Sequence, residues 1–259
     1  YEMSDTLALV RKDDAQTADF IREKFAIPHQ VVTVDESSIL IVDDCNRRWR
    51  LPLGDAEYSS LIGQDVLRIC REVATERDLF NCHGTFYELP AENADGYAKM
   101  RPIASHNFRI HDYASYRGML VMTGINPKEM KNKEHIIVSE DGKAAVWAGA
   151  IDDLWEMGKP VGKGGPWKNT AVKAGEASDP YLIGFYDKKN LTLSHSSQSD
   201  VTFTVEVDPT GNGKWVKYAT LTVKPGEQMK HEFKAPFQAR WIRFSIDADT
   251  NATAWLEYK

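Results

Sequence analysis

Cysteine is scarce in this sequence: three residues, Cys45, Cys70 and Cys82, form no C-x-x-C pair. This odd number at irregular spacing excludes a disulfide-rich scaffold and a structural zinc site, and it is typical of buried free thiols. No run of about 18 apolar residues is present, so the sequence predicts no membrane span. Basic residues form no cluster and the net charge is -6, which argues against nucleic acid as the main partner.

The sequence predicts no signal peptide at the start of the chain, whose first residue is Tyr1 rather than methionine. We therefore interpret the sequence as a processed protein or as a piece excised from a longer one. Its 259 residues are enough to bury a sizeable core in one large or two medium domains.

Strand patterns dominate what the sequence does contain. In residues 1–175, short apolar and β-branched runs are separated by turns at intervals of about ten residues, which is typical of antiparallel sheets. The strongest hairpin signal is Asp141-Gly142, between two apolar runs. Sheets of about 40 to 60 residues have the size of propeller blades, and a propeller needs at least about four. We expect a propeller-like multi-sheet region with about three blades, the others lying on residues outside this chain or on another chain.

Residues 176–259 have a different pattern. Six candidate strands follow one another with almost no helical periodicity, and Pro and Gly mark the turns between them. This pattern predicts a C-terminal β-sandwich of the jelly-roll type, and the fold class as a whole is all-β. The large aromatic residues of these strands are expected to pack in the core; they are Trp215, Tyr218, Trp241 and Trp255.

Two stretches of the first region alternate between polar and apolar residues, as half-buried strands do. We interpret Phe80 to Leu89 as one strand, with Asn81 and His83 on its polar face. Arg101 to Tyr113 is expected to form a second strand. If the charged sides of both strands converge, they line one polar pocket.

Three residues on or just before the first stretch are the candidates for acid–base chemistry: Glu76, Asp78 and His83. An imidazole can act as acid or base near neutral pH, and hydrolysis of a glycosidic bond commonly uses two carboxyl groups. Each candidate also has a structural interpretation. A histidine can bond the backbone of a neighbouring strand, and Glu76-Arg77-Asp78 can form a local ion-pair network.

The candidate substrate-binding residues surround this cluster. Guanidinium groups match the carboxylate of a uronic acid bidentately, although each arginine could equally form a surface salt bridge. The glycine-rich segment 158–168 is either an ordered surface loop or a flap that brings side chains to the rim of the pocket. The histidine spacing matches no standard metal motif, and we expect neither a metal nor a cofactor. The substrate-binding set is Arg77, Asn81, Arg101, His106, Arg109, Trp155, Lys163 and Trp167.

Three segments resemble the C-terminal part of long bacterial proteins in which a β-propeller carries a terminal β-sandwich: residues 81–87, 139–147 and 164–167. The resemblance extends over residues 30–259. It implies a protein that acts on glycans in the periplasm or outside the cell, and it implies no particular catalytic residue.

Three functional hypotheses follow from these patterns. The first is a glycoside hydrolase or lyase region that acts on an acidic, uronic-acid-containing glycan. The alternative is a non-catalytic glycan-binding or scaffold module of a larger β-propeller protein. A third, weaker hypothesis is an interaction module whose sheets pack on a partner chain.

Overall fold

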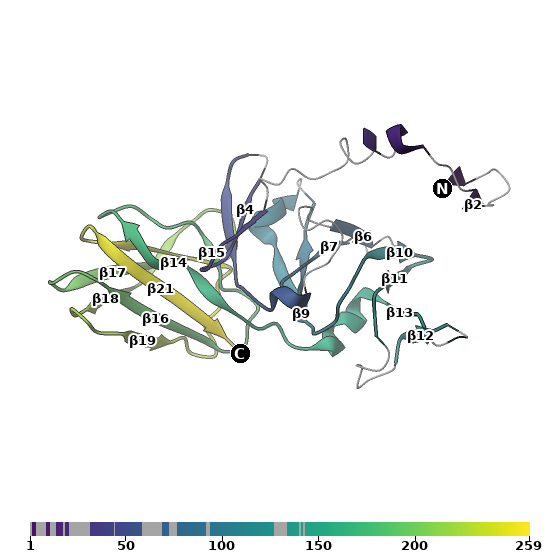
Figure 1. Ribbon diagram of the computed structural model, residues 1–259. Helices are drawn as coiled ribbons and strands as arrows, with labels where there is room; N and C mark the ends of the chain where they lie inside the picture. Colours follow the sequence, from purple (N-terminus) through teal and green to yellow (C-terminus); the bar gives the residue numbers. More distant parts are fainter. Residues whose placement is uncertain are drawn as a thin grey trace.

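The structure is a computed structural model, and its described residues form an all-β protein of several antiparallel sheets. This confirms the predicted fold class. Figure 1 shows a two-sheet sandwich at one end of the molecule and two four-stranded sheets towards the other end. The described residues are 14–17, 19–20, 32–43, 45–58, 78–91, 94–126, 134–139, 141 and 143–259, with the backbone alone of 2–3, 9–10, 69–72 and 77.

The sandwich consists of eight strands, β14 to β21. One sheet has the order β14-β21-β16-β19, and the other contains β18-β17-β20-β15. This distribution of consecutive strands over two four-stranded sheets is the topology of an eight-stranded jelly roll, as the turn pattern predicts. The bounds are β14 (Gly162–Val172), β15 (Tyr181–Leu182), β16 (Lys189–His195), β17 (Val201–Asp208), β18 (Val216–Val223), β19 (Met229–Glu232), β20 (Trp241–Ile246) and β21 (Thr250–Tyr258).

Strict alternation along the strands builds the sandwich core. In β17 every second residue from Val201 to Val207 is buried, and the residues between them are half-buried on the outer face. Phe203 and Phe244 are fully buried from one sheet, and Leu256 is fully buried from the other. Side chains with a period of two can only face each other in this way if the two sheets pack face to face.

An N-terminal antiparallel unit extends the second sheet to seven strands. It consists of β3 (Val32–Val34), β4 (Ile39–Val42) and β5 (Arg48–Leu51). Pro52 directly follows β5, and a proline at the end of a strand is typical of a sheet edge, but β5 is an internal strand. β5 lies between β4 and β15, to which it pairs in parallel, and Pro52 lies just beyond the paired residues.

The domain boundary proposed at residue 175 stays a prediction, but two described contacts cross it. β14, which ends at Val172, pairs with β21 inside the sandwich. β5 pairs with β15 through Arg50 and Tyr181. The jelly roll therefore begins at Gly162, and the unit β3–β5 is joined to it through continuous backbone pairing.

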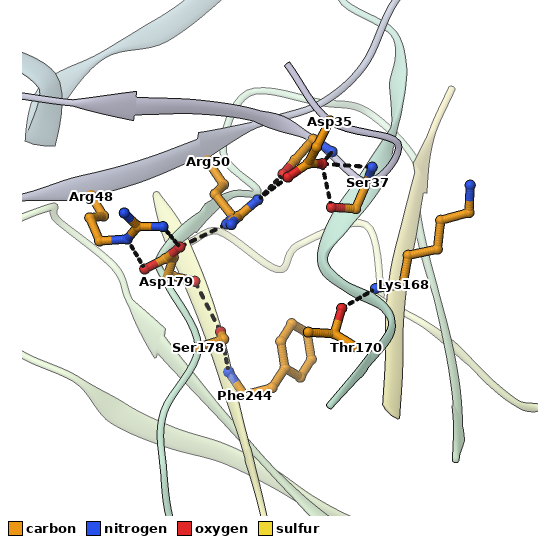
Figure 2. Close-up of polar contacts among 10 residues, drawn as sticks. Asp35, Ser37, Arg48, Arg50, Lys168, Thr170, Ser178, Asp179 and Phe244 are labelled. Atoms are coloured by element: carbon orange, nitrogen blue, oxygen red, sulfur yellow. Dashed lines mark hydrogen bonds and ion pairs between the residues drawn. The ribbon is translucent and has the colours of Figure 1, made fainter. Parts of the chain in front are cut away.

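A network of ion pairs fixes this unit to the sandwich, as Figure 2 shows. Asp179 accepts hydrogen bonds from Arg48 and from Arg50, at 2.9 and 2.8 Å. Arg50 also donates to Asp35 and to the hydroxyl of Ser38. Burial alone would raise the pKa of Asp179, but the hydrogen bonds and charges of the two arginines outweigh burial and hold the pKa below its ordinary value.

Replacing Asp179 with asparagine is expected to lower the free energy of unfolding by about 2 kcal/mol. The physical reason is that the Arg50 side chain, only 12% exposed, loses its more buried anionic partner. Urea unfolding at pH 7 measures the change. Asp187→Asn is the matched control, because Asp187 pairs with Lys159 on the exposed surface. A loss at Asp179 no larger than that of the control contradicts the expectation.

The two four-stranded sheets occupy the middle of the chain. The first is a meander of β6 (Ile69–Glu72), β7 (Arg77–Cys82), β8 (Thr85–Leu89) and β9 (Arg101–Ser105). The second sheet has the order β10-β11-β13-β12. Its strands β12 and β13 pair in antiparallel register, which confirms the hairpin predicted from Asp141-Gly142. Both sheets have the strand number of propeller blades, and the described residues form no closed propeller. The strands of the second sheet are β10 (Tyr113–Tyr116), β11 (Met119–Met122), β12 (Ile136–Val138) and β13 (Ala145–Gly149).

Three short 3-10 helices and one further strand pair are also described, as are helical residues at 15–17 and 19–20. The strand pair is antiparallel and joins residues near the N-terminus. The helix η5 packs near β9, and η4 lies within the connection between β8 and β9. Their bounds are β1 (Glu2–Met3), β2 (Leu9–Val10), η2 (Ala56–Tyr58), η4 (Gly96–Lys99) and η5 (Ile151–Met157).

The segment expected as one strand from Phe80 to Leu89 is instead a hairpin of β7 and β8. His83 and Gly84 form its two-residue turn with φ angles of 49° and 71°. Positive φ at both central residues is the type I′ pattern, which closes hairpins tightly. Phe80 belongs to the core shared with the sandwich, whereas Phe86 packs in a second core with the strands of the other sheet. The hairpin is therefore buried on both faces, and it has no continuous polar face.

Candidate functional site

The His83 side chain projects from the hairpin turn and is only partly exposed. Its carbonyl oxygen accepts a hydrogen bond from the backbone of Asp55 at 2.9 Å, and a Cβ on Gly54 would clash with that carbonyl. Burial lowers the pKa of His83, and the nearby charge of Asp55 opposes this shift without cancelling it. His83 is thus held in a tightly packed turn rather than on a polar strand face, because His83–Gly84 is where the chain reverses.

Asp78, one of the two proposed acid–base partners of His83, does not lie beside it. Asp78 lies near the opposite end of β7, about 16 Å along the strand at the usual rise per residue, and its backbone pairs with Leu89. A separation of this size keeps the Asp78 carboxyl and the His83 imidazole from forming a hydrogen-bonded acid–base pair. Glu76 lies outside the described residues, and Arg77 is described by its backbone alone. The prediction that Glu76 and Arg77 act on substrate stays a prediction.

Asn81 and His106 form a buried polar pair beneath the hairpin. Nε2 of His106 lies 2.8 Å from Oδ1 of Asn81, and Nδ1 of His106 accepts the backbone N–H of Phe108. The imidazole is therefore neutral with its proton on Nε2. Burial lowers the pKa of His106 to about 4. The Asn81 side chain also donates to the carbonyl of Tyr58. These contacts give both residues a structural role, and their predicted role in substrate binding stays a prediction.

Two of the three candidate arginines pair with carboxylates. Arg101 donates to Glu88 at 2.8 Å across neighbouring strands β9 and β8. Arg109, which is exposed, pairs with Glu57. These pairs are the surface salt bridges that the sequence leaves open as an interpretation. The guanidinium groups of Arg101 and Arg109, which are predicted to bind a uronic acid, are thus each paired with a carboxylate of the protein itself.

The glycine-rich segment is neither a loop nor a flap. Most of it belongs to β14, and the Lys163 backbone exchanges two hydrogen bonds with Leu53. Trp167 is only 6% exposed and packs against Phe244 in the sandwich core, so it lines no rim. Trp155 is 61% exposed on η5. The segment pairs as a strand because its glycines lie at a β-bulge where other backbones approach closely.

A groove of about 830 Å³ lies elsewhere, on the outer face of the sheet β14-β21-β16-β19. Small-molecule sites typically have volumes of about 300 to 1,000 Å³. Strand register arranges most of the lining in cross-strand rows. From one end to the other, these rows are Glu232–Asn190–Glu257, Lys230–Thr192–Trp255 and Ser194–Thr253. Further lining residues are Lys168, Leu191, Gln228 and His231.

Trp255 is the aromatic centre of this groove. It is half-buried on the outer face, whereas its neighbours Ala254 and Leu256 are fully buried in the core. The ammonium of Lys168 lies 5.5 Å from the centroid of the Trp255 ring. Hydroxyl, amide, carboxylate and ammonium groups around the ring supply both donors and acceptors. The groove thus combines one apolar ring with many hydrogen-bonding groups.

From the sequence, Trp255 is expected to pack in the core. In the structure it is half-buried and lines the groove. The alternation of β21 contains the missing signal, because the residues with the same parity as Trp255 are Thr253 and Glu257. An aromatic residue between polar residues on one strand face belongs to the solvent-facing side. The expectation of core packing is correct for Trp241, which is fully buried.

Comparison with known proteins identifies no family. No protein-family model and no curated protein matches the sequence. Among solved structures, tripeptidyl peptidase 2 (TPP II) gives a TM-score of 0.28 at 10% identity over 54% of this chain and 18% of that chain. A glycoside hydrolase family 43 arabinoxylan arabinofuranohydrolase from Bacillus subtilis gives 0.23 at 11% identity, over 70% of this chain and 53% of that chain.

A third similar structure is the exo-beta-1,3-galactanase of Phanerochaete chrysosporium, with a TM-score of 0.21, 10% identity, and coverage of 88% and 67% of the two chains. TM-scores this low carry no argument about fold or function. This chain spans 18% and 53% of the first two structures. The described residues contain no helix that is long and apolar enough to cross a membrane. They also contain no group of three or more His, Cys, Asp and Glu residues that could hold a metal ion.

Proposed function

We propose that this protein binds a glycan in the groove on the outer face of the sheet β14-β21-β16-β19. The observation that carries the proposal is the position of Trp255, half-exposed at the centre of a groove whose other residues are mostly polar. Sugars present apolar C–H faces and a rim of hydroxyl groups. An indole ring can stack on the first, and short polar side chains can bond the second.

The chemistry of the rows fits hydroxyl recognition. Asn190 lies between Glu232 and Glu257, so one end of the groove offers amide and carboxylate oxygens as acceptors. Thr192 lies directly between Lys230 and Trp255, where a hydroxyl and an ammonium can donate to sugar oxygens. Because these side chains project from paired strands, their spacing is fixed by the sheet before any ligand binds, and this lowers the ordering cost of binding.

This proposal develops the non-catalytic alternative of the sequence analysis. A hydrolase or lyase that acts on an acidic glycan through Glu76, Asp78 and His83 stays a prediction, and so does a periplasmic or extracellular location. The hydrolase hypothesis lacks support from the described residues, because Asp78 lies near the start of β7 and His83 lies in the turn beyond its other end. The candidate arginines Arg101 and Arg109 are paired with carboxylates.

Replacing Trp255 with alanine is expected to weaken glycan binding by about tenfold or more, because the stacking surface of one indole is lost. Isothermal titration calorimetry of the full chain with a panel of neutral and uronic-acid-containing oligosaccharides measures the change. The matched control is Trp215→Ala. Trp215 is also half-buried and contacts a cation, Arg243, at 4.3 Å, but it does not line the groove.

The control variant should bind as the unaltered protein does. Equal weakening in both variants would show that the loss reflects general destabilisation of the sandwich. Binding that is unchanged in Trp255→Ala rejects the groove as the site. Absence of binding to every oligosaccharide in the panel rejects the proposed function.

A further inference from the structure

We propose that Glu36 restricts the groove to uncharged glycans by neutralising the cation beside its aromatic ring. The inference rests on the proposed function, which it deepens by naming the substrate class. It assigns a specificity role to a residue of the N-terminal unit, outside the jelly roll that holds the rest of the groove.

Glu36 meets the groove through Lys168. Nζ of Lys168 lies 3.3 Å from the carbonyl oxygen and 3.4 Å from Oε2 of Glu36. The same ammonium lies over the Trp255 ring. An ammonium has three donors, and these contacts direct two of them to Glu36. A sugar stacked on Trp255 therefore meets a cation whose charge is already balanced by a carboxylate.

The backbone position of Glu36 is set by a hydrogen-bonded turn, and its side chain, which is 78% exposed, pairs with Lys168 at the surface. Asp35 accepts three hydrogen bonds within the turn, from the backbone and hydroxyl of Ser37 and from the backbone of Ser38. Arg50 holds the same carboxylate from the neighbouring strand, as Figure 2 shows. The pKa of Asp35 lies below its ordinary value, because these hydrogen bonds outweigh the opposing effect of burial.

The turn is also fixed directly to β14. The backbone N–H of Gly165 donates to the carbonyl of Ser37 at 3.0 Å, and a Cβ on Gly164 would clash with that carbonyl. Gly164 has a φ of 140°, a conformation that favours glycine. The glycines of β14 thus allow the turn to approach closely enough for Glu36 to reach Lys168, three residues after Gly165.

The charges around the groove then decide between glycan classes. Its lining contains two lysines and two glutamates, Lys168, Lys230, Glu232 and Glu257, whose formal charges sum to zero. Adding Glu36 gives a formal charge of -1. Burial lowers the pKa of the remaining titratable lining residue, His231, which is therefore mainly neutral at pH 7. A uronic acid would meet net repulsion here, whereas a neutral sugar would meet none.

Glu36→Gln tests this assignment, because it removes the charge and retains the side-chain length and the backbone carbonyl that Lys168 contacts. Titration calorimetry of the full chain should show binding of neutral oligosaccharides by the unaltered protein and weaker binding of uronic-acid-containing oligosaccharides. In Glu36→Gln, affinity for the acidic oligosaccharides should rise by about threefold at low salt, the scale of an exposed ion pair, and the gain should shrink at high salt. Affinity for the neutral oligosaccharides should not change.

The matched control is Glu176→Gln, which makes the same change in net charge at an exposed turn away from the groove lining. If both variants have equal affinity for acidic oligosaccharides and still bind neutral oligosaccharides, the role of Glu36 is contradicted. The proposed function is not contradicted by that result. Preference of the unaltered protein for acidic oligosaccharides also contradicts the role of Glu36. If the unaltered protein binds no oligosaccharide of either class, the proposed function fails, and the inference fails with it.

Discussion

Replacing Trp241 with alanine is expected to lower the free energy of unfolding by about 4 kcal/mol. Trp241 is fully buried, and it joins three parts of the molecule. It belongs to β20 of the sandwich, its ring lies 4.8 Å from that of Trp49 in β5, and its Nε1–H donates to the carbonyl of Ala98 in η4 at 2.8 Å. A cavity at this position therefore removes packing from three parts of the molecule: the sandwich, the unit β3–β5, and the β8–β9 connection of the sheet β6-β7-β8-β9.

Trp241→Phe separates the packing from the hydrogen bond. Phenylalanine retains most of the apolar volume but leaves the carbonyl of Ala98 without its indole donor, so a smaller loss of about 1 to 2 kcal/mol is expected. Urea unfolding monitored by circular dichroism measures both variants. A single cooperative transition whose urea midpoint is lowered in Trp241→Ala indicates that the three parts unfold together. A change below about 1 kcal/mol in Trp241→Ala contradicts the description of this residue as a buried junction.

A second large effect is expected from pH and His106. The pKa of His106 in the folded protein is about 4, against an ordinary value of 6.5. Between these values the unfolded chain binds a proton that the folded protein does not bind, so stability falls as the pH is lowered through this window. The contribution is complete above about pH 6.5, and about 3 kcal/mol of it is lost by pH 4.

Comparison with His106→Gln isolates this contribution, because glutamine can still donate to Asn81 and does not titrate. Burial also lowers the pKa values of His83 and His231, so both contribute to the same pH window in either protein. Unfolding free energies measured at intervals from pH 7.5 to about pH 4 should fall less steeply in the variant, with the difference reaching about 3 kcal/mol. Parallel profiles for the two proteins would show that His106 titrates normally.

The sandwich could be predicted from the sequence because its local signals agree with one another. Strict alternation in β17, and turns rich in Pro and Gly such as that at Lys224-Pro225-Gly226, specify strand and turn without reference to the rest of the chain. The Asp141-Gly142 hairpin belongs to the same class of local signal. The parallel pairing of β5 with β15 has no such signal, because Arg50 and Tyr181 are 131 residues apart in the sequence.

The expected polar strand face around His83 is absent for a different reason, because the segment is a hairpin. A period-two pattern does not show where a chain reverses, and the residues before and after His83–Gly84 alternate in a way that imitates one strand. His83 was only a weak indication of the turn, because positive φ is uncommon for any residue other than glycine, although histidine is enriched there. Trp255 could have been recognised from the polar residues at positions 253 and 257, whereas the approach of Glu36 to Lys168 depends on tertiary packing that no local pattern encodes.

One nuclear magnetic resonance titration tests the central claim, that the groove around Trp255 is the ligand site. The indole N–H resonance of Trp255 is assigned by its disappearance in Trp255→Phe, and neutral oligosaccharides are then added to the unaltered protein. We expect a saturable shift of this resonance, while the N–H resonances of the buried indoles of Trp167 and Trp241 remain unchanged. A ligand that shifts the resonances of the His83–Gly84 turn and leaves that of Trp255 unchanged would contradict it.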